Sequence, residues 1–146
     1  MDKRRFAVSL GLALAFATPA TMVFGHGDVQ PQPVDTTGLD AVGADWLAEN
    51  PYRVKGGDQY ELARKIGASG YNQNCARCHG LEAISGGIAP DVRFLEEGAL
   101  GDEWFMERVR KGFTQNGAYK MPPFQDVISQ EAMWAIRSYI ETQPQD

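Results

Sequence analysis

Both cysteines and one of the two histidines of this 146-residue chain lie in one five-residue stretch, CARCH, at positions 75–79. Three chemistries use such a cluster: a dithiol redox pair, a zinc site and the covalent attachment of a haem. Each of them requires different residues or a different fold elsewhere in the sequence. The rest of the chain therefore decides which of the three chemistries the stretch serves.

The companions of a redox pair and of a zinc site are missing from the sequence. A C-x-x-C redox pair usually belongs to a βαβ fold, and no such alternation is apparent. Structural zinc sites mostly use four ligands, and only His26 or a carboxylate could join Cys75, Cys78 and His79. C-x-x-C-H is, however, the attachment signature of c-type haem. The motif therefore predicts one haem c tethered by Cys75 and Cys78 with His79 as axial iron ligand, with zinc and a redox switch as the alternatives.

A second axial ligand is expected from a methionine. Met106 and Met133 lie in amphipathic stretches, where methionine is usually core filler. His26 lies near the expected mature terminus, where chains are poorly ordered. Met121 differs because the two prolines that follow it stiffen the backbone and prevent a helix. We predict Met121 as the second iron ligand, the alternative being a loop methionine that packs on the core.

Pro90 is predicted to support His79. A ligating imidazole usually donates its other ring N–H to an acceptor, and the backbone carbonyl of Pro90, in GGIAPD, is a candidate acceptor. An ordinary proline turn is the alternative.

The first 25 residues are expected to be a cleaved signal peptide. The basic start MDKRR precedes the apolar run FAVSLGLALAFA at 6–17, and small residues follow. These twelve apolar residues are too few to span a bilayer, which takes about 20. We therefore predict export to the periplasm, without stable membrane insertion; haem is joined to c-type proteins outside the cytoplasm.

Size and charge limit the partners. Without its first 25 residues the chain loses three of its 14 basic and one of its 19 acidic residues, which leaves 11 and 18 and a formal charge of −7. The sequence contains no stripe of basic residues that could neutralise phosphates, which argues against binding to nucleic acid. A negative protein favours partners with positive patches, in encounters that weaken with salt. The length is that of one small domain, and a monomer is expected.

The mature part is predicted to consist of an N-terminal arm, 26–57, and a domain, 58–146. Prolines and the Gly56-Gly57 pair disfavour a long regular element in the arm, and its aromatic residues predict that it docks on the domain. The domain is predicted to be all-α, without strands. Its three helices are expected at 58–75 with Asp58 as cap, 103–111 with Asp102 as cap, and 129–143 with Ser129 as cap.

Two further features of the helices predict how they pack. Glycine inside a helix costs about 1 kcal/mol relative to alanine, so Gly67 and Gly70 on one face of the first helix predict close approach of another helix. Trp134 lies off the apolar face of the last helix. We expect the arm to cover it.

In this order, a first helix, CARCHG, the Pro90 loop, a middle helix, Met121 and a last helix resemble the class I c-type cytochromes. Several segments are similar, more narrowly, to the PedF-type periplasmic cytochromes c that accept electrons from PQQ-dependent (quinoprotein) alcohol dehydrogenases. These segments are HGDVQPQPVDTTGL, NPYR, IGASGYNQNCARCHGLEAISGGIAPD, MPPF and SQEAMWAIRSYIE.

The resemblance implies the class I cytochrome c fold, in which the N- and C-terminal helices cross around one covalently bound haem, with Gly67, Tyr71 and Tyr139 at the crossing. It also makes Trp104 a candidate to donate its indole N–H to a haem propionate, although a half-buried helix aromatic would look the same. Weaker candidates for this role are Arg93 and Lys120.

The function that the resemblance implies is that of a soluble single-haem electron carrier, not an enzyme. It would take electrons one at a time from a quinoprotein alcohol dehydrogenase and pass them to a terminal oxidase or another cytochrome. The alternatives are a haem c subunit of another dehydrogenase or oxidase complex, and a five-coordinate haem c protein that binds gases or reduces peroxide.

Overall fold

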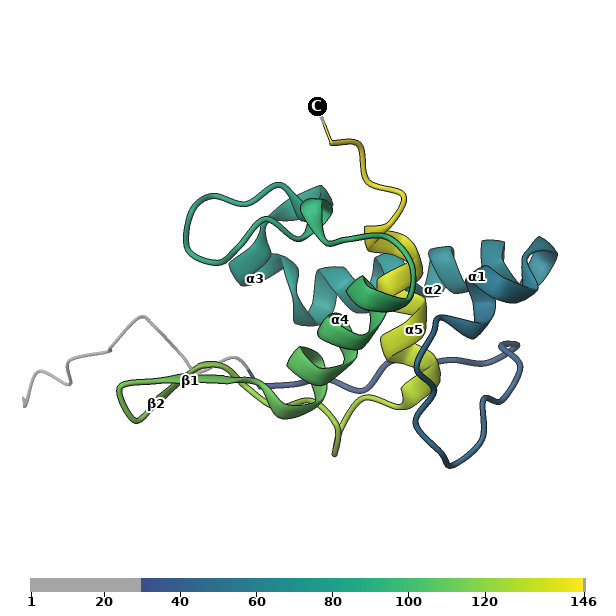
Figure 1. Ribbon diagram of the computed structural model, residues 1–146, viewed down its shortest axis with the longest axis horizontal. Coiled ribbons are helices and arrows are strands. Elements are labelled where there is room, and N and C mark those ends of the chain that lie inside the picture. The colour runs from purple at the N-terminus through teal and green to yellow at the C-terminus, as the bar shows by residue number, and fades with distance from the viewer. Residues whose placement is uncertain (1–29, 146) are drawn as a thin grey trace, which may run out of the picture.

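The computed structural model describes residues 30–145, so the predicted signal peptide and His26 lie outside the described residues. Short and long helices pack together, and one small hairpin projects from them (Figure 1). Among residues 30–145, no helix is long and apolar enough to cross a membrane. The elements are α1 (Pro51–Lys55), α2 (Gly57–Asn74), α3 (Ala76–His79), η1 (Leu81–Ala83), η2 (Val92–Phe94), α4 (Ala99–Lys111), β1 (Phe113–Gln115), β2 (Ala118–Met121) and α5 (Gln130–Ile140).

The core is centred where α2 and α5 run across one another (Figure 1). At Gly67 the two backbones touch, because an added Cβ would lie 1.9 Å from the Ala135 carbonyl oxygen. At Gly70, one turn further, a Cβ would meet the Ile136 side chain at 3.1 Å. A side chain at Gly67 would push the two helices apart, whereas one at Gly70 would require the Ile136 side chain to shift by a few tenths of an ångström. The close approach predicted from these glycines is confirmed.

Helix α5 begins as predicted, since Ser129 Oγ accepts a hydrogen bond from the Ala132 N–H at 3.3 Å. The cap predicted for α2 is wrong. Gly56 occupies the cap position without a side-chain hydrogen bond, and Asp58 lies inside the first turn. An acidic residue there still interacts favourably with the helix dipole.

The cap predicted for α4 is also wrong, because this helix begins at Ala99 and Asp102 lies within its first turn. Asp102 is completely buried and accepts hydrogen bonds from Arg137 Nε at 2.9 Å and Arg53 Nη2 at 2.6 Å. Burial opposes ionisation of this carboxyl, but the hydrogen bonds from the two arginines outweigh it and lower the pKa of Asp102. Its carboxylate therefore joins α1, α4 and α5 instead of capping a helix.

Residues 113–121 form an antiparallel hairpin, which corrects the expectation of a loop without strands. Phe113 pairs with Met121 across the two strands. The turn is Asn116-Gly117, with φ of +52° and +76°, and Asn-Gly is the pair that favours positive φ at both central positions of a hairpin turn. Apart from this hairpin, the described part of the chain is helical and irregular.

The arm is ordered by packing, as predicted, although its last residues form α1. Gln130 on α5 holds the arm at two points, accepting from the Leu47 N–H at 2.7 Å and donating to the Asp45 carbonyl oxygen at 3.0 Å. The indole N–H of Trp134, which is fully buried, donates to the same Gln130 side chain at 3.2 Å. Trp134 is thus buried and shares Gln130 with the arm, which agrees with the expected docking; direct cover of Trp134 by the arm stays a prediction. The domain boundary at residue 57 stays a prediction.

Candidate haem site

The CARCH stretch forms a single tight turn directly after α2. Cys75 ends α2, and its carbonyl oxygen accepts from the Cys78 N–H at 3.1 Å and the His79 N–H at 2.9 Å. The two cysteines form no disulfide with each other, and both are partly exposed. The turn therefore presents two thiols and an imidazole from one short piece of backbone.

The surroundings of the thiols oppose a redox switch. Although part of Cys75 reaches the surface, the packing around it raises the pKa of its thiol to about 12, with Cys78 as a smaller cause. A reactive dithiol needs a lowered pKa that yields thiolate. Within residues 30–145, no three His, Cys, Asp or Glu side chains come together as a metal ion would require. Of the three chemistries, haem attachment fits these residues best.

His79 is held through one ring nitrogen. Its Nδ1 lies 2.9 Å from the Pro90 carbonyl oxygen, and because a carbonyl only accepts, this nitrogen carries the proton. The lone pair is then on Nε2, the atom left to bind iron. The contact predicted for Pro90 is present. The role of His79 as a ligand stays a prediction.

Gly80 and Tyr71 close the turn from behind. Gly80 has a φ of +82°, and an added Cβ would lie 1.8 Å from the Ile84 carbonyl oxygen. The fully buried Tyr71 donates its hydroxyl to the Gly80 carbonyl oxygen at 2.9 Å. Burial raises the pKa of Tyr71, which keeps the phenol protonated as a donor. The family resemblance places Tyr71 only at the helix crossing, and no local sequence pattern indicates this hydrogen bond.

Met121 ends β2 and is partly buried against the core. Its carbonyl oxygen lies over Gly112, where an added Cβ would come within 2.4 Å of it. Just beyond, the Phe124 N–H donates to the Val109 carbonyl oxygen at 3.0 Å. The hairpin is thus fixed to the end of α4 at both of its ends. Figure 1 shows it on the same side of the molecule as α3, with α4 between them.

The other two methionines of residues 30–145 behave as core residues, with Met106 4% and Met133 0% exposed. Trp104 is 44% exposed, and its ring centre lies 5.2 Å from the Arg108 guanidinium carbon. Its role as a propionate donor stays a prediction. Arg93, one of the two weaker candidates, donates to the Asp91 carboxylate at 2.9 Å, a pair that the D-x-R spacing after Pro90 could have indicated. The propionate roles of Arg93 and Lys120 also stay predictions.

Large exposed apolar side chains are concentrated in the sequence between the CARCH turn and α5. Among the described residues, nine of the eleven such side chains lie between Leu81 and Val127. This stretch therefore offers exposed apolar side chains on which a large apolar ring could pack. The donor set, two thiols and an oriented imidazole from one turn, fits a haem.

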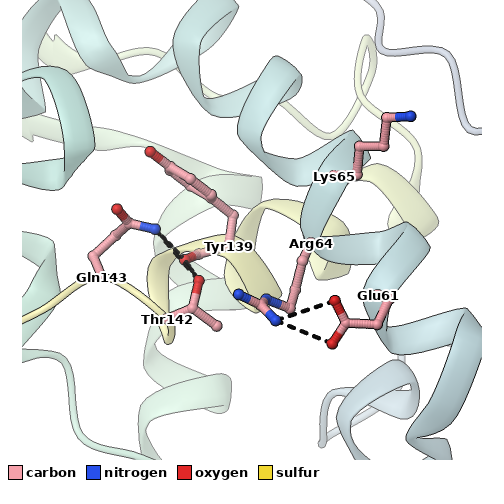
Figure 2. A pocket seen from close by; sticks show the side chains of 6 residues that line it. All are labelled: Glu61, Arg64, Lys65, Tyr139, Thr142 and Gln143. Carbon is pink, nitrogen blue, oxygen red and sulfur yellow. Dashed lines mark hydrogen bonds and ion pairs between the residues drawn. The ribbon is translucent and has the colours of Figure 1, made fainter.

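A hollow of about 320 Å³ in the protein surface is not part of this site (Figure 2). Its polar groups largely satisfy one another: Arg64 donates to Glu61 at 3.0 Å, and the side chains of Thr142 and Gln143 donate to the Tyr139 carbonyl oxygen at 2.7 and 2.9 Å. No residue of the CARCH turn lines it. The residues that do are Glu61, Arg64, Lys65, Tyr139, Thr142 and Gln143.

Comparisons with known proteins point to the same class. The family model described as cytochrome C oxidase, cbb3-type, subunit III matches residues 63–140. Cytochrome c550 of Pseudomonas aeruginosa is 59% identical over 131 residues, which is 90% of this chain and 90% of that protein. No solved structure matches.

Two larger proteins match over a shorter stretch. The quinohemoprotein alcohol dehydrogenase ADH-IIG of Pseudomonas putida is 33% identical over 76 residues, 52% of this chain but 10% of that enzyme. The dehydrogenase subunit of an alcohol dehydrogenase (quinone) from Gluconobacter oxydans is 39% identical over 89 residues, 60% of this chain and 11% of that subunit.

The family match spans more than half of the chain, and the cytochrome c550 match covers nearly all of it. Both agree with the paired thiols, the oriented imidazole and the helical frame. The chain therefore belongs to the class I c-type cytochromes, as a homologue of cytochrome c550, and is a single-haem electron carrier with covalently bound haem c.

Proposed function

We propose that the protein is a soluble periplasmic carrier that takes single electrons from a PQQ-dependent alcohol dehydrogenase and delivers them towards the respiratory chain. The observation that carries this proposal is the likeness of the chain to about a tenth of two quinone-linked alcohol dehydrogenases. Those enzymes contain a segment similar to this carrier. A dehydrogenase without such a segment needs a separate protein to accept its electrons.

Four residues carry the chemistry in this proposal. Cys75 and Cys78 are the tethers, and His79 and Met121 are the axial ligands. When bound, haem supplies a one-electron ferric/ferrous couple. His79 keeps its Nδ1 proton on the Pro90 carbonyl oxygen, 2.9 Å away, so that Nε2 presents a lone pair in a fixed direction. The soft thioether of Met121 favours the reduced state.

The donor is identified by a mixing experiment. The ferric protein is mixed with a substrate-reduced quinoprotein alcohol dehydrogenase, and haem reduction is followed in time. We expect reduction much faster than that of an unrelated class I cytochrome of similar net charge, and we expect its rate to fall with added salt because exposed charges are screened. Equal rates for the two cytochromes would contradict the proposed donor and leave the carrier class intact.

The axial ligand is identified by the ferric optical spectrum. Met121→Leu should abolish the weak far-red band of methionine-ligated ferric haem, because leucine has no sulfur. Met106→Leu and Met133→Leu are the matched controls, since both residues are buried in helices and a methionine-to-leucine change conserves volume. A wild-type protein that lacks the band and binds CO readily when reduced would be the five-coordinate gas-binding or peroxidase alternative.

A second candidate function is that of a haem c subunit of an oxidase, which the description of the matching family model favours. Purification from the native host distinguishes the two candidates. A carrier is recovered alone from the soluble fraction, whereas a subunit is recovered with its complex.

A further inference from the structure

The carbonyl group that receives the His79 proton belongs to a loop closed by its own hydrogen bonds. On one side of Pro90, Ser85 Oγ donates to the Ala89 carbonyl oxygen at 2.5 Å. The Gly87 N–H donates to the same hydroxyl oxygen at 3.0 Å. The backbone just before Pro90 is therefore held to the beginning of the loop.

On the other side, Asp91 and Arg93 form a pair with both carboxylate oxygens engaged. Arg93 Nε donates to Asp91 Oδ1 at 3.1 Å and Arg93 Nη2 donates to Oδ2 at 2.9 Å. The Arg93 side chain is 9% exposed. Hydrogen bonds from Arg93 lower the pKa of Asp91 to about 2, so the carboxylate is ionised at neutral pH. Such two-point pairs are directional as well as strong.

The C-terminal tail, residues 141–145, holds this pair. Arg93 Nη1 donates to the Pro144 carbonyl oxygen at 2.9 Å, and Gln145 Nε2 donates to the Arg93 carbonyl oxygen at 2.7 Å. Figure 1 shows the tail leaving α5 at the end of the molecule where the loop between α3 and α4 lies. Helix α5 packs on α2, and α2 ends at Cys75. The tail that follows α5 therefore connects the Pro90 loop to the helix that precedes the CARCH turn.

We propose that Asp91 and Arg93, clamped by the tail, are positioning residues for His79. They hold the Pro90 carbonyl at the distance and direction in which it accepts the imidazole proton. This inference rests on the proposed role of His79 as iron ligand. An acceptor on Nδ1–H raises the basicity of the ligating imidazole, so the clamp also determines how strongly His79 stabilises the ferric state.

The test uses the haem-loaded protein and proton NMR of the His79 ring. Arg93→Lys keeps the charge but loses the two-point contact, and Arg93→Gln loses the ion pair altogether. We expect solvent exchange of the Nδ1 proton to accelerate severalfold, more in Arg93→Gln than in Arg93→Lys. Arg93→Lys, which conserves the charge, should also shift the midpoint potential upward. A weaker hydrogen bond from His79 Nδ1 to the Pro90 carbonyl lowers the basicity of the imidazole, which then stabilises the ferric state less.

A second variant and a control make the test independent of folding. Deletion of residues 144–146 removes both hydrogen bonds between the tail and Arg93 and leaves the loop sequence unchanged. It should accelerate solvent exchange of the His79 Nδ1 proton in the same way. Arg64→Gln, which removes an arginine paired with Glu61 at 3.0 Å (Figure 2), should leave both exchange and potential unchanged.

The failures of the two proposals are distinguishable. A wild-type protein without a hyperfine-shifted imidazole proton would refute His79 as ligand, and so the proposed site. A wild-type protein with that proton, whose exchange and potential survive Arg93→Lys, Arg93→Gln and the deletion, would refute the positioning role alone. A loss of thermal stability with unchanged exchange would refute it equally.

Discussion

The two predicted axial ligands belong to segments that are held in different ways. His79 lies in a turn held by two hydrogen bonds from side chains: its own imidazole donates to the Pro90 carbonyl oxygen, and the Tyr71 hydroxyl donates to the Gly80 carbonyl oxygen. Met121 ends a hairpin in which residues 113–120 are all exposed, and only the two ends of that hairpin contact α4. The comparison indicates that the histidine side is defined by many contacts and the methionine side by two. Glycines on each side allow this difference to be tested.

The largest effect is expected on the histidine side, from Gly80→Ala. The new Cβ would lie 1.8 Å from the Ile84 carbonyl oxygen at a φ of +82°, so backbone must move. We expect a loss of roughly 3 kcal/mol or more in the free energy of unfolding, the sum of backbone strain and overpacking. Urea unfolding of the haem-loaded protein measures it.

Gly87→Ala is the matched control, because Gly87 has a φ of +91° and nothing within 4 Å of an added Cβ. It should cost only the strain, about 1 kcal/mol. Equal losses in Gly80→Ala and Gly87→Ala would mean that the turn is not held as tightly as the contacts suggest.

A smaller effect is expected on the methionine side, from Gly112→Ala. Its Cβ would lie 2.4 Å from the Met121 carbonyl oxygen at a φ of +71°. We expect a loss of about 2 kcal/mol together with a weaker far-red methionine band, because Met121 is displaced. In Gly117→Ala, with a φ of +76° and open space, the band should be retained. Loss of the far-red band in both Gly112→Ala and Gly117→Ala would mean that the contact at Gly112 is not what holds Met121 in place.

Removal of a single hydroxyl should have a still smaller effect. Tyr71→Phe breaks the 2.9 Å hydrogen bond to the Gly80 carbonyl oxygen, and a buried hydrogen bond contributes about 1 kcal/mol. Tyr119→Phe on the hairpin, where the side chain is 66% exposed, should change stability by much less. Thermal unfolding of the two variants compares the sides directly, and equal shifts in Tm would contradict the difference between them.

The last effect is a pH dependence confined to the histidine side. The pKa of Asp91 falls from 3.8 to about 2 in the folded protein, so its stabilisation is present above pH 3.8 and is lost as the pH falls towards 2. The stability advantage of wild type over Asp91→Asn should therefore shrink across this range. The hairpin, residues 113–121, contains no acidic residue, so the difference between wild type and Gly112→Ala should stay constant. If the stability differences of Asp91→Asn and Gly112→Ala from wild type both declined with falling pH, titration of Asp91 would not be the cause.

The parts of the fold that followed from the sequence are those with local causes. The spacing of the two cysteines and His79 already carried the haem chemistry, and the glycine at position 67 already required a neighbouring helix. Asp102 was misjudged because an acidic residue before an apolar run looks like a cap. Its real partners, Arg53 and Arg137, are distant in sequence, and no local pattern indicates them.

The hairpin was missed for a related reason. Strands are recognised by alternating apolar and polar residues, and this pattern requires that one face be buried. Both strands here are exposed almost throughout, so the turn pair Asn116-Gly117 is the one feature of the sequence that indicates the hairpin. The hydrogen bond between His79 and Pro90 was foreseeable, because it follows from what a ligating imidazole needs. The hydrogen bonds between Arg93 and the tail were not, since residues 93 and 144 lie 51 positions apart in the sequence.

The crossing of α2 and α5 also has a consequence for the order of folding. The glycine-rich face of α2 finds its partner only in α5, which follows α3, α4 and the hairpin in the sequence. This contact is therefore long-range, and such contacts form late because a long stretch of chain must first be closed into a loop. The CARCH stretch, at the end of α2, precedes that closure in the chain.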